Sequence, residues 1–114
     1  MMLTLSLLLN IAVLIPVCIG IMTKAAWANS AYGPDSPARG ILLSIYMAIT
    51  LISALLLLFG TPLLAAPLLL VQIAYKVTTP FTVRTVRNPV VVSNLAIAAF
   101  HGLTLWTIRP VFFA

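Results

Sequence analysis

The chain has almost no acidic side chains. Asp35 is the single carboxylate side chain in 114 residues, beside six Lys and Arg residues, so the net charge is +5 and the pI is about 10.2. The pI is high because acids are scarce, and not because bases are abundant. A nucleic-acid surface needs a dense basic face, which six dispersed cations cannot supply. We therefore expect no nucleic-acid partner, and no carboxylate-driven antiporter.

Cysteine is nearly absent as well. Cys18 stands alone within an apolar run, which excludes an intramolecular disulfide and a cysteine-based metal cluster. A cysteine nucleophile needs a nearby base, and the only histidine, His101, is predicted at a different membrane depth. The chain also has no glycine-rich phosphate loop. With no catalytic set and no metal site, we predict that the protein is not an enzyme and that Cys18 is a small buried apolar residue.

Apolar residues, in contrast, make up 63% of the chain, and its mean hydropathy is +1.23. Three long apolar runs begin with a capping residue followed by proline, at Ser36-Pro37, Thr61-Pro62 and Asn88-Pro89. A cap oxygen satisfies a free backbone N–H, and proline at the first helical position loses no hydrogen bond. We predict one all-α membrane domain over residues 1–114, with four spans at about 3–22, 37–59, 62–77 and 89–108.

Two of these segments allow other interpretations. The third span is short and interrupted by Pro67, so it could be a tilted full span or a re-entrant arm, and we favour the full span. The tight Gly60-Thr61 turn predicts that the second and third spans form an antiparallel hairpin. The first segment could be a cleaved signal peptide ending at 26–28, but its start has no Lys or Arg and its apolar run is long, which favours a retained helix.

The cations predict an orientation. Five of the six flank the loops 23–36 and 78–88, and only Arg109 lies on the opposite side; the five are Lys24, Arg39, Lys76, Arg84 and Arg87. Basic short loops stay in the cytoplasm, so both termini should face the periplasm or exterior of a bacterial inner membrane. These loops could also attract anionic lipid. Asp35 could pair with Arg39, four residues on, or favour the positive start of that helix.

Four strongly polar side chains fall within the predicted spans: Asn10, Gln72, Asn94 and His101. At about 1.5 Å per residue, Asn10 and His101 share one depth, and Gln72 and Asn94 share another. We therefore predict two pairs, Asn10 with His101 and Gln72 with Asn94. The plainest role for both pairs is hydrogen bonding between helices.

Small residues recur at four-residue spacing on two helices and favour close packing there: Gly40, Ser44 and Ala48, and Ala98 with Gly102. Thr50 and Ser53 are expected to bond back to carbonyls of their own helix.

Three functional hypotheses remain. The leading one is a small membrane protein that acts by helix association, with other membrane subunits or with itself as partner. The second is a transporter or channel subunit, which requires the four polar residues to share one cavity. The third is an electron-transfer anchor in which His101 binds haem or acts in quinone chemistry. No cofactor is predicted, and haem bound through His101 is kept as the alternative.

Overall fold

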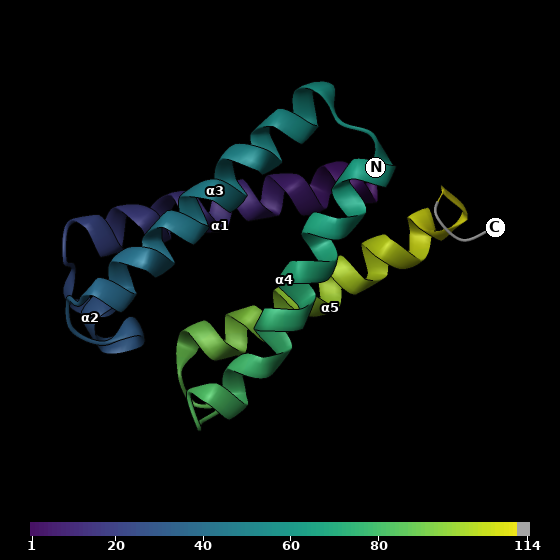
Figure 1. Cartoon of the computed structure of the whole chain (residues 1–114). Helices are drawn as coiled ribbons and strands as arrows, with labels where there is room; N and C mark the ends of the chain where they lie inside the picture. The colour runs from purple at the N-terminus through teal and green to yellow at the C-terminus, as the bar shows by residue number, and fades with distance from the viewer. Residues whose placement is uncertain (112–114) are drawn as a thin grey trace.

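The computed structural model describes residues 1–111, and within that range it contains helices and no strand. The helices are α1 (Met2–Met22), α2 (Ala26–Tyr32), α3 (Pro37–Phe59), α4 (Pro62–Thr82) and α5 (Pro89–Ile108), followed by the 3-10 turn η1 (Arg109–Val111) (Figure 1). The predicted all-α fold is confirmed. Helix α2 was not expected, because its seven residues lie in a segment predicted as a loop.

Four helical segments are long and apolar enough to cross a membrane: α1, α3, α4, and α5 together with η1. The longest dimension of the fold is 45 Å, close to the roughly 40–45 Å of a bilayer with its headgroups. Large apolar side chains such as Ile41, Leu58 and Leu70 are exposed along these helices. Such surfaces are stable in hydrocarbon, so helix length and surface chemistry both fit a membrane protein.

The cap-proline pairs begin helices α3, α4 and α5, with proline as the first helical residue in each. The Ser36 side chain accepts a hydrogen bond from the Arg39 N–H, and the Asn88 side chain accepts one from the Val90 N–H. Thr61 makes no such bond, so the cap expected there is absent. Proline alone is sufficient to start α4, because its missing N–H needs no partner.

The third span is longer than predicted. Helix α4 runs over 21 residues to Thr82, and Pro67 and Pro80 both lie inside it. The expected end at residue 77 was wrong because the polar residues Thr78 and Thr79 continue the helix, with Thr79 donating to the Lys76 carbonyl. At about 1.5 Å per residue the helix is about 31 Å long, enough for a full span.

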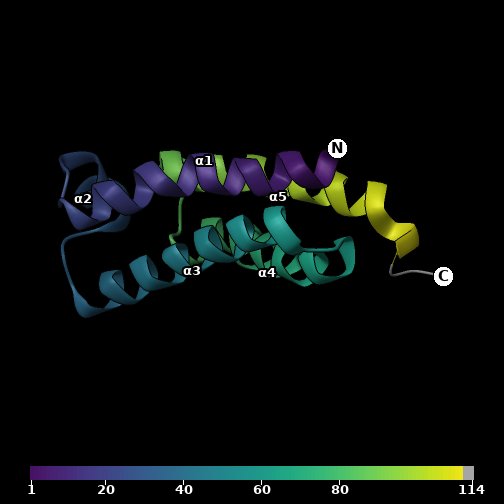
Figure 2. The same cartoon turned by 90° about the horizontal axis from the view of Figure 1, so that it is seen from above.

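The helices pack as two pairs. Helix α1 packs along α3, helix α4 packs along α5, and α1 also contacts α5 (Figure 1 and Figure 2). Helices α3 and α4 are joined by two residues but contact each other far less than the paired helices do. Helices α3 and α4, which were expected to pack as a hairpin, are thus adjacent in sequence. Helix α3 packs mainly against α1, and α4 packs mainly against α5.

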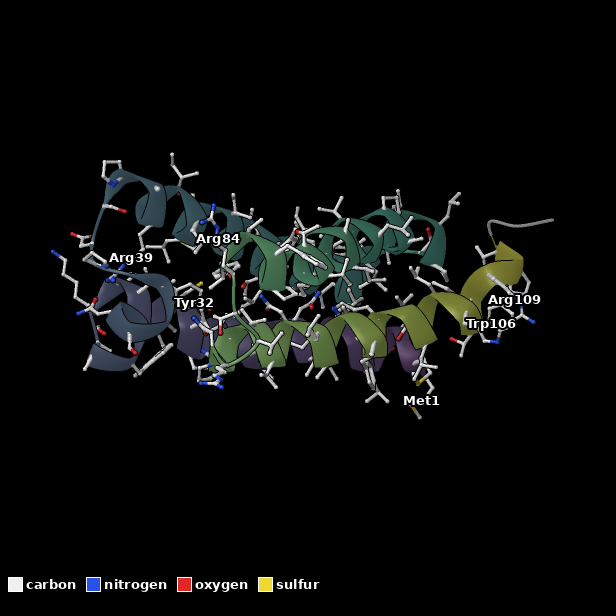
Figure 3. The ribbon with its side chains drawn as sticks, turned by 90° about the horizontal axis from the view of Figure 1, so that it is seen from below. Met1, Tyr32, Arg39, Arg84, Trp106 and Arg109 are labelled. Atoms are coloured by element: carbon white, nitrogen blue, oxygen red, sulfur yellow. The ribbon has the colours of Figure 1, made fainter. Side chains whose placement is uncertain are left out.

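The two ends of the bundle differ in charge. Figure 3 shows Arg39 and Arg84 at the end that holds α2, and Met1 and Arg109 at the other. We call the first the α2 end. A small apolar core lies toward it, formed by α1, α2 and α3. Helix α2 approaches closely enough that the Trp27 ring occupies the place of a Cβ at Gly20, so a larger residue there would displace the ring.

Candidate functional site

Five polar side chains form a cluster where α1, α3 and α5 meet: Ser6, Asn10, Ser53, His101 and Thr104, each 3% exposed or less. His101 Nε2 lies 2.9 Å from Asn10 Oδ1, and His101 Nδ1 lies 3.1 Å from Ser6 Oγ. The predicted contact between Asn10 and His101 is confirmed. We call these five residues the histidine cluster.

The neighbours of His101 select one neutral tautomer. Asn10 Oδ1 can only accept, so Nε2 carries the proton and Nδ1 accepts the hydroxyl proton of Ser6. Ser6 Oγ and Thr104 Oγ1 are 2.5 Å apart, and with the Ser6 proton directed at the ring, Thr104 donates to Ser6. Every member of this chain of hydrogen bonds has a partner. The cluster therefore joins α1 to α5 as a satisfied network.

Ser53 connects the network to α3. Its hydroxyl accepts from Asn10 Nδ2 at 3.1 Å. The expectation that Ser53 bonds only within its own helix was wrong, because its side chain points into the bundle at 0% exposure. Thr50, by contrast, donates to the Tyr46 carbonyl at 2.8 Å, as predicted. Both nitrogens of His101 are engaged, so ligation of haem iron would require one of these bonds to break.

Lys76 is the least expected residue of the interior. It is 3% exposed, and its Nζ donates to Asn94 Oδ1 at 3.1 Å and lies 5.0 Å from the centre of the Tyr75 ring. It lies about 6 Å along α4 from the helix middle, within the hydrocarbon region. Its assignment to a basic loop was wrong, because α4 continues past it and turns its side chain toward α5.

Gln72 does not pair with Asn94 as predicted. Its amide nitrogen donates to the Leu68 carbonyl at 3.4 Å, while the Asn94 oxygen accepts from Lys76, one turn further along α4. Gln72 Oε1 and the Tyr75 hydroxyl are buried without a hydrogen-bond partner among the described residues. An unpaired buried polar atom costs about 1–3 kcal/mol. Polar groups near Lys76 are therefore less well satisfied than those around His101.

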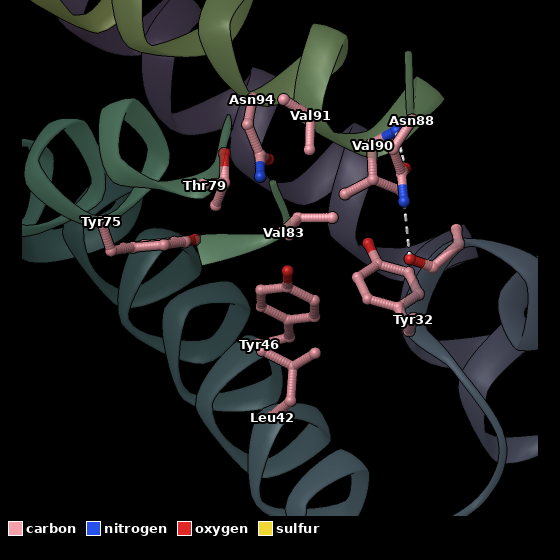
Figure 4. A pocket seen from close by; sticks show the side chains of 11 residues that line it. Tyr32, Leu42, Tyr46, Tyr75, Thr79, Val83, Asn88, Val90, Val91 and Asn94 are labelled. Carbon is pink, nitrogen blue, oxygen red and sulfur yellow. Dashed lines mark hydrogen bonds between the residues drawn. The ribbon is translucent and has the colours of Figure 1, made fainter. Parts of the chain in front are cut away.

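Two neighbouring cavities adjoin Asn94, and Lys76 lines the larger of them. The larger, about 230 Å³, is lined by residues of all five α-helices, including Trp27, Lys76 and Asn94. The smaller, about 150 Å³, shares Tyr32, Tyr46 and Asn94 with it. Figure 4 shows the hydroxyls of Tyr46 and Tyr75 and the amide of Asn94 directed toward the smaller space.

The polar pathway required by the transporter hypothesis is not present in these two cavities. Of the four predicted polar residues, Asn94 lines both cavities, whereas Asn10, Gln72 and His101 line neither. Instead, Asn10 and His101 belong to the histidine cluster, Asn94 bonds to Lys76, and Gln72 bonds only within its own helix. Within residues 1–111, no three His, Cys, Asp or Glu side chains lie close enough together to hold a metal ion.

Arg39 is a structural residue and not a free loop cation. It is 3% exposed, and its guanidinium donates to Asn29 Oδ1 at 2.5 Å and to the carbonyls of Gly33 and Ile21 at 2.7 and 3.2 Å. These bonds fasten α2 to the ends of α1 and α3. Arg39 reaches these groups because the Ser36 cap places it in the first turn of α3, next to the loop that follows α2.

Asp35 pairs with Lys24 at 3.1 Å, and not with Arg39, which was one of the two roles open to it. The hydrogen bond and the positive charge of Lys24 hold the pKa of Asp35 below its usual value. Both side chains are exposed, so the pair contributes little to stability. Tyr32 is the last residue of α2, and its burial raises the pKa of its hydroxyl, which therefore stays protonated. Arg84 and Arg87 are exposed in the loop after α4, where they were predicted.

The small residues of α3 do not pack inside the fold. Gly40, Ser44 and Ala48 are exposed, and a Cβ at Gly40 would meet nothing within 4 Å. They lie opposite the buried side chains Tyr46 and Ser53. The expected close packing through this row is therefore absent within one chain. On α5, Ala98 is buried, but a Cβ at Gly102 would meet nothing within 4 Å, so only one of these two residues packs closely.

No protein-family model, curated protein or solved structure matches this chain. The geometry of the described residues is therefore the basis for any functional conclusion.

Sequence reasoning missed Ser6 and Thr104 and misplaced Lys76. A signal for the first two was available, because Ser6 precedes Asn10 by four residues and Thr104 follows His101 by three, so each shares a helix face with its neighbour. Lys76 gave no comparable signal. A lysine near a helix end normally extends to the interface, and only the position of α5 reveals that it is buried.

Proposed function

We propose that this protein is a small multi-pass protein of the bacterial inner membrane that acts by helix association, as a homo-oligomer or as an accessory subunit, and not by catalysis. The observation that carries this proposal is the outward row Gly40, Ser44 and Ala48 on α3. Small residues spaced by four allow two helix backbones to approach closely in a bilayer. Of the four spans, α3 is also the least buried within the chain.

The state of the interior supports the same proposal. Ser6, Asn10 and His101 satisfy one another's hydrogen bonds, so they stabilise the fold without presenting reactive atoms. Outward small residues have no such use within a single chain. A second copy of the chain is the simplest partner, because it presents the same row.

The proposed orientation keeps both termini outside the cytoplasm. Lys76 lies inside α4, so the α2 end retains four cations, Lys24, Arg84, Arg87 and the buried Arg39 at the start of α3, against Arg109 at the other end. This bias still supports a cytoplasmic α2 end. Labelling of single cysteines placed at Thr85 and at Pro110, each in a Cys18→Ala background, by a membrane-impermeant reagent tests it, with only the second expected to react from outside.

The association is tested by measuring the dimer fraction in vesicles by single-molecule photobleaching. We expect dimers for the natural chain, and at least a fivefold weaker association for Ala48→Leu, because the added side chain separates the backbones. Ala74→Leu, an equal change at an exposed position of α4, is the matched control and should leave the dimer fraction unchanged. A natural chain that stays monomeric at high protein density, or equal effects of the two variants, contradicts the homo-oligomer.

A further inference from the structure

The interior holds one ammonium group without an acidic partner. The single acidic side chain of the sequence, Asp35, lies in the loop before α3 and pairs with Lys24. Lys76 Nζ has three N–H donors and one hydrogen-bond acceptor, Asn94 Oδ1, with the Tyr75 ring face nearby. Both neighbours are neutral. A buried charged group in a membrane span marks a functional site by default.

Lys76 borders a space large enough for a ligand. It lines the 230 Å³ cavity with Asn94, and the other walls are apolar side chains of α1, the rings of Trp27, Tyr32 and Tyr46, and Pro89, Val90 and Ser93 at the start of α5. An apolar cavity of about 150 Å³ holds a benzene molecule. The cavity near Lys76 is larger, so it has room for a compact apolar body together with a small charged group.

From the buried ammonium and the adjoining cavity, we infer that this protein binds a monoanion with a compact apolar body, its charged group on Lys76 and its body among Trp27, Tyr32 and Tyr46. The anion takes the N–H donors that Asn94 leaves free. The exposed Arg84 and Arg87 give the α2 end a positive field that attracts anions. This inference goes beyond helix association and does not depend on it.

Trp27 supplies the readout, because it lines the cavity while Trp106 lies at the opposite end of the bundle (Figure 3). The protein with Trp106→Phe, in phosphatidylcholine vesicles, is titrated with benzoate and with its neutral analogue benzamide. We expect a saturable change in Trp27 fluorescence with benzoate, and at least tenfold weaker binding of benzamide. Equal affinities for the two compounds, or no saturable change with millimolar benzoate, overturn the inference.

Two variants locate the charge that binds. Lys76→Met removes the charge. Asn94→Asp leaves Lys76 in place and puts a carboxylate where the amide is now, whose Oδ1 lies 3.1 Å from Lys76 Nζ. Both should weaken benzoate binding at least tenfold, while Lys24→Met, an exposed lysine, should not. Asn94→Asp does not delete the buried charge, so it tests the site even if Lys76→Met fails to fold. Natural affinity in Asn94→Asp overturns the inference.

The source of the anion is separated by lipid composition. Phosphatidylglycerol carries an anionic headgroup that could occupy the same site as a free carboxylate. If a headgroup is the occupant, adding phosphatidylglycerol to the vesicles weakens benzoate binding in the natural chain. Unchanged affinity assigns the site to a free carboxylate. Both outcomes support an anion site at Lys76.

Discussion

The hydrogen bond between Asn10 and His101 permits a quantitative test of the interior. Asn10 bonds to His101 and Ser53, and His101 bonds to Asn10 and Ser6. Replacing Asn10 or His101 with leucine removes two hydrogen bonds in each case, whereas the double replacement removes three, because one bond is shared. Hydrogen bonds between membrane helices average about 0.6 kcal/mol, with a maximum near 1.7 kcal/mol.

Each single replacement should therefore lower the free energy of unfolding by about 1.2 kcal/mol, and the double replacement by about 1.8 kcal/mol. The coupling energy is the value of the shared bond, about 0.6 kcal/mol. It rises toward about 1.7 kcal/mol if the cluster isolates the pair well from lipid. Leucine is chosen because it keeps the cavity filled, so that lost hydrogen bonds dominate the measured change.

The assay is reversible unfolding in mixed detergent micelles, followed by circular dichroism for the natural chain, the two single variants and the double variant. Ser44→Ala combined with His101→Leu is the control pair, since Ser44 is exposed and bonds only to the Gly40 carbonyl. That pair should be additive within about 0.3–0.5 kcal/mol. Additivity of Asn10→Leu and His101→Leu to the same degree refutes the shared hydrogen bond.

Further predictions concern the α2 end. Gly20→Ala forces the Trp27 ring off α1, so the fluorescence of Trp27 should shift to the red as the ring becomes more hydrated. Arg39→Met should lower the free energy of unfolding by at least about 1.5 kcal/mol, because it removes charge-assisted bonds to three groups, whereas Lys24→Met at the surface should change it little. The pKa of Asp35 is lower in the folded protein than in the unfolded chain. Its small stabilising effect is therefore fully present when the pH is above the pKa of the unfolded chain, and it is lost as the pH falls through the pKa of the folded protein. Comparing Asp35→Asn with the natural chain between neutral and acid pH should show a stability difference that disappears in acid.

The spans were predictable because local chemistry specifies them. Proline after a polar residue fixes where α3, α4 and α5 begin, and long apolar runs require burial in lipid or protein wherever they lie. The end of α4 was missed because Thr78 and Thr79 look polar enough for a loop. Their hydroxyls bond to carbonyls three residues earlier, which a linear reading does not anticipate.

The site was only partly predictable, for a geometric reason. Depth along a helix can be counted from the sequence, and counting paired Asn10 with His101 correctly. Depth does not determine which of two residues on one helix face makes a contact. Gln72 and Lys76 are one turn apart on α4, and in the folded chain Asn94 bonds to Lys76.

The sequence by itself determined that this chain is helical, how many segments can span a membrane, and where most of those segments begin, because these properties follow from hydropathy, backbone sterics and capping along a single segment. Only the tertiary structure decided that Lys76 and Arg39 are buried, that Ser53 joins the histidine cluster, and that the small residues of α3 face outward. Those outcomes depend on the rotation of each helix about its axis. That rotation is set by how the two helix pairs pack against each other.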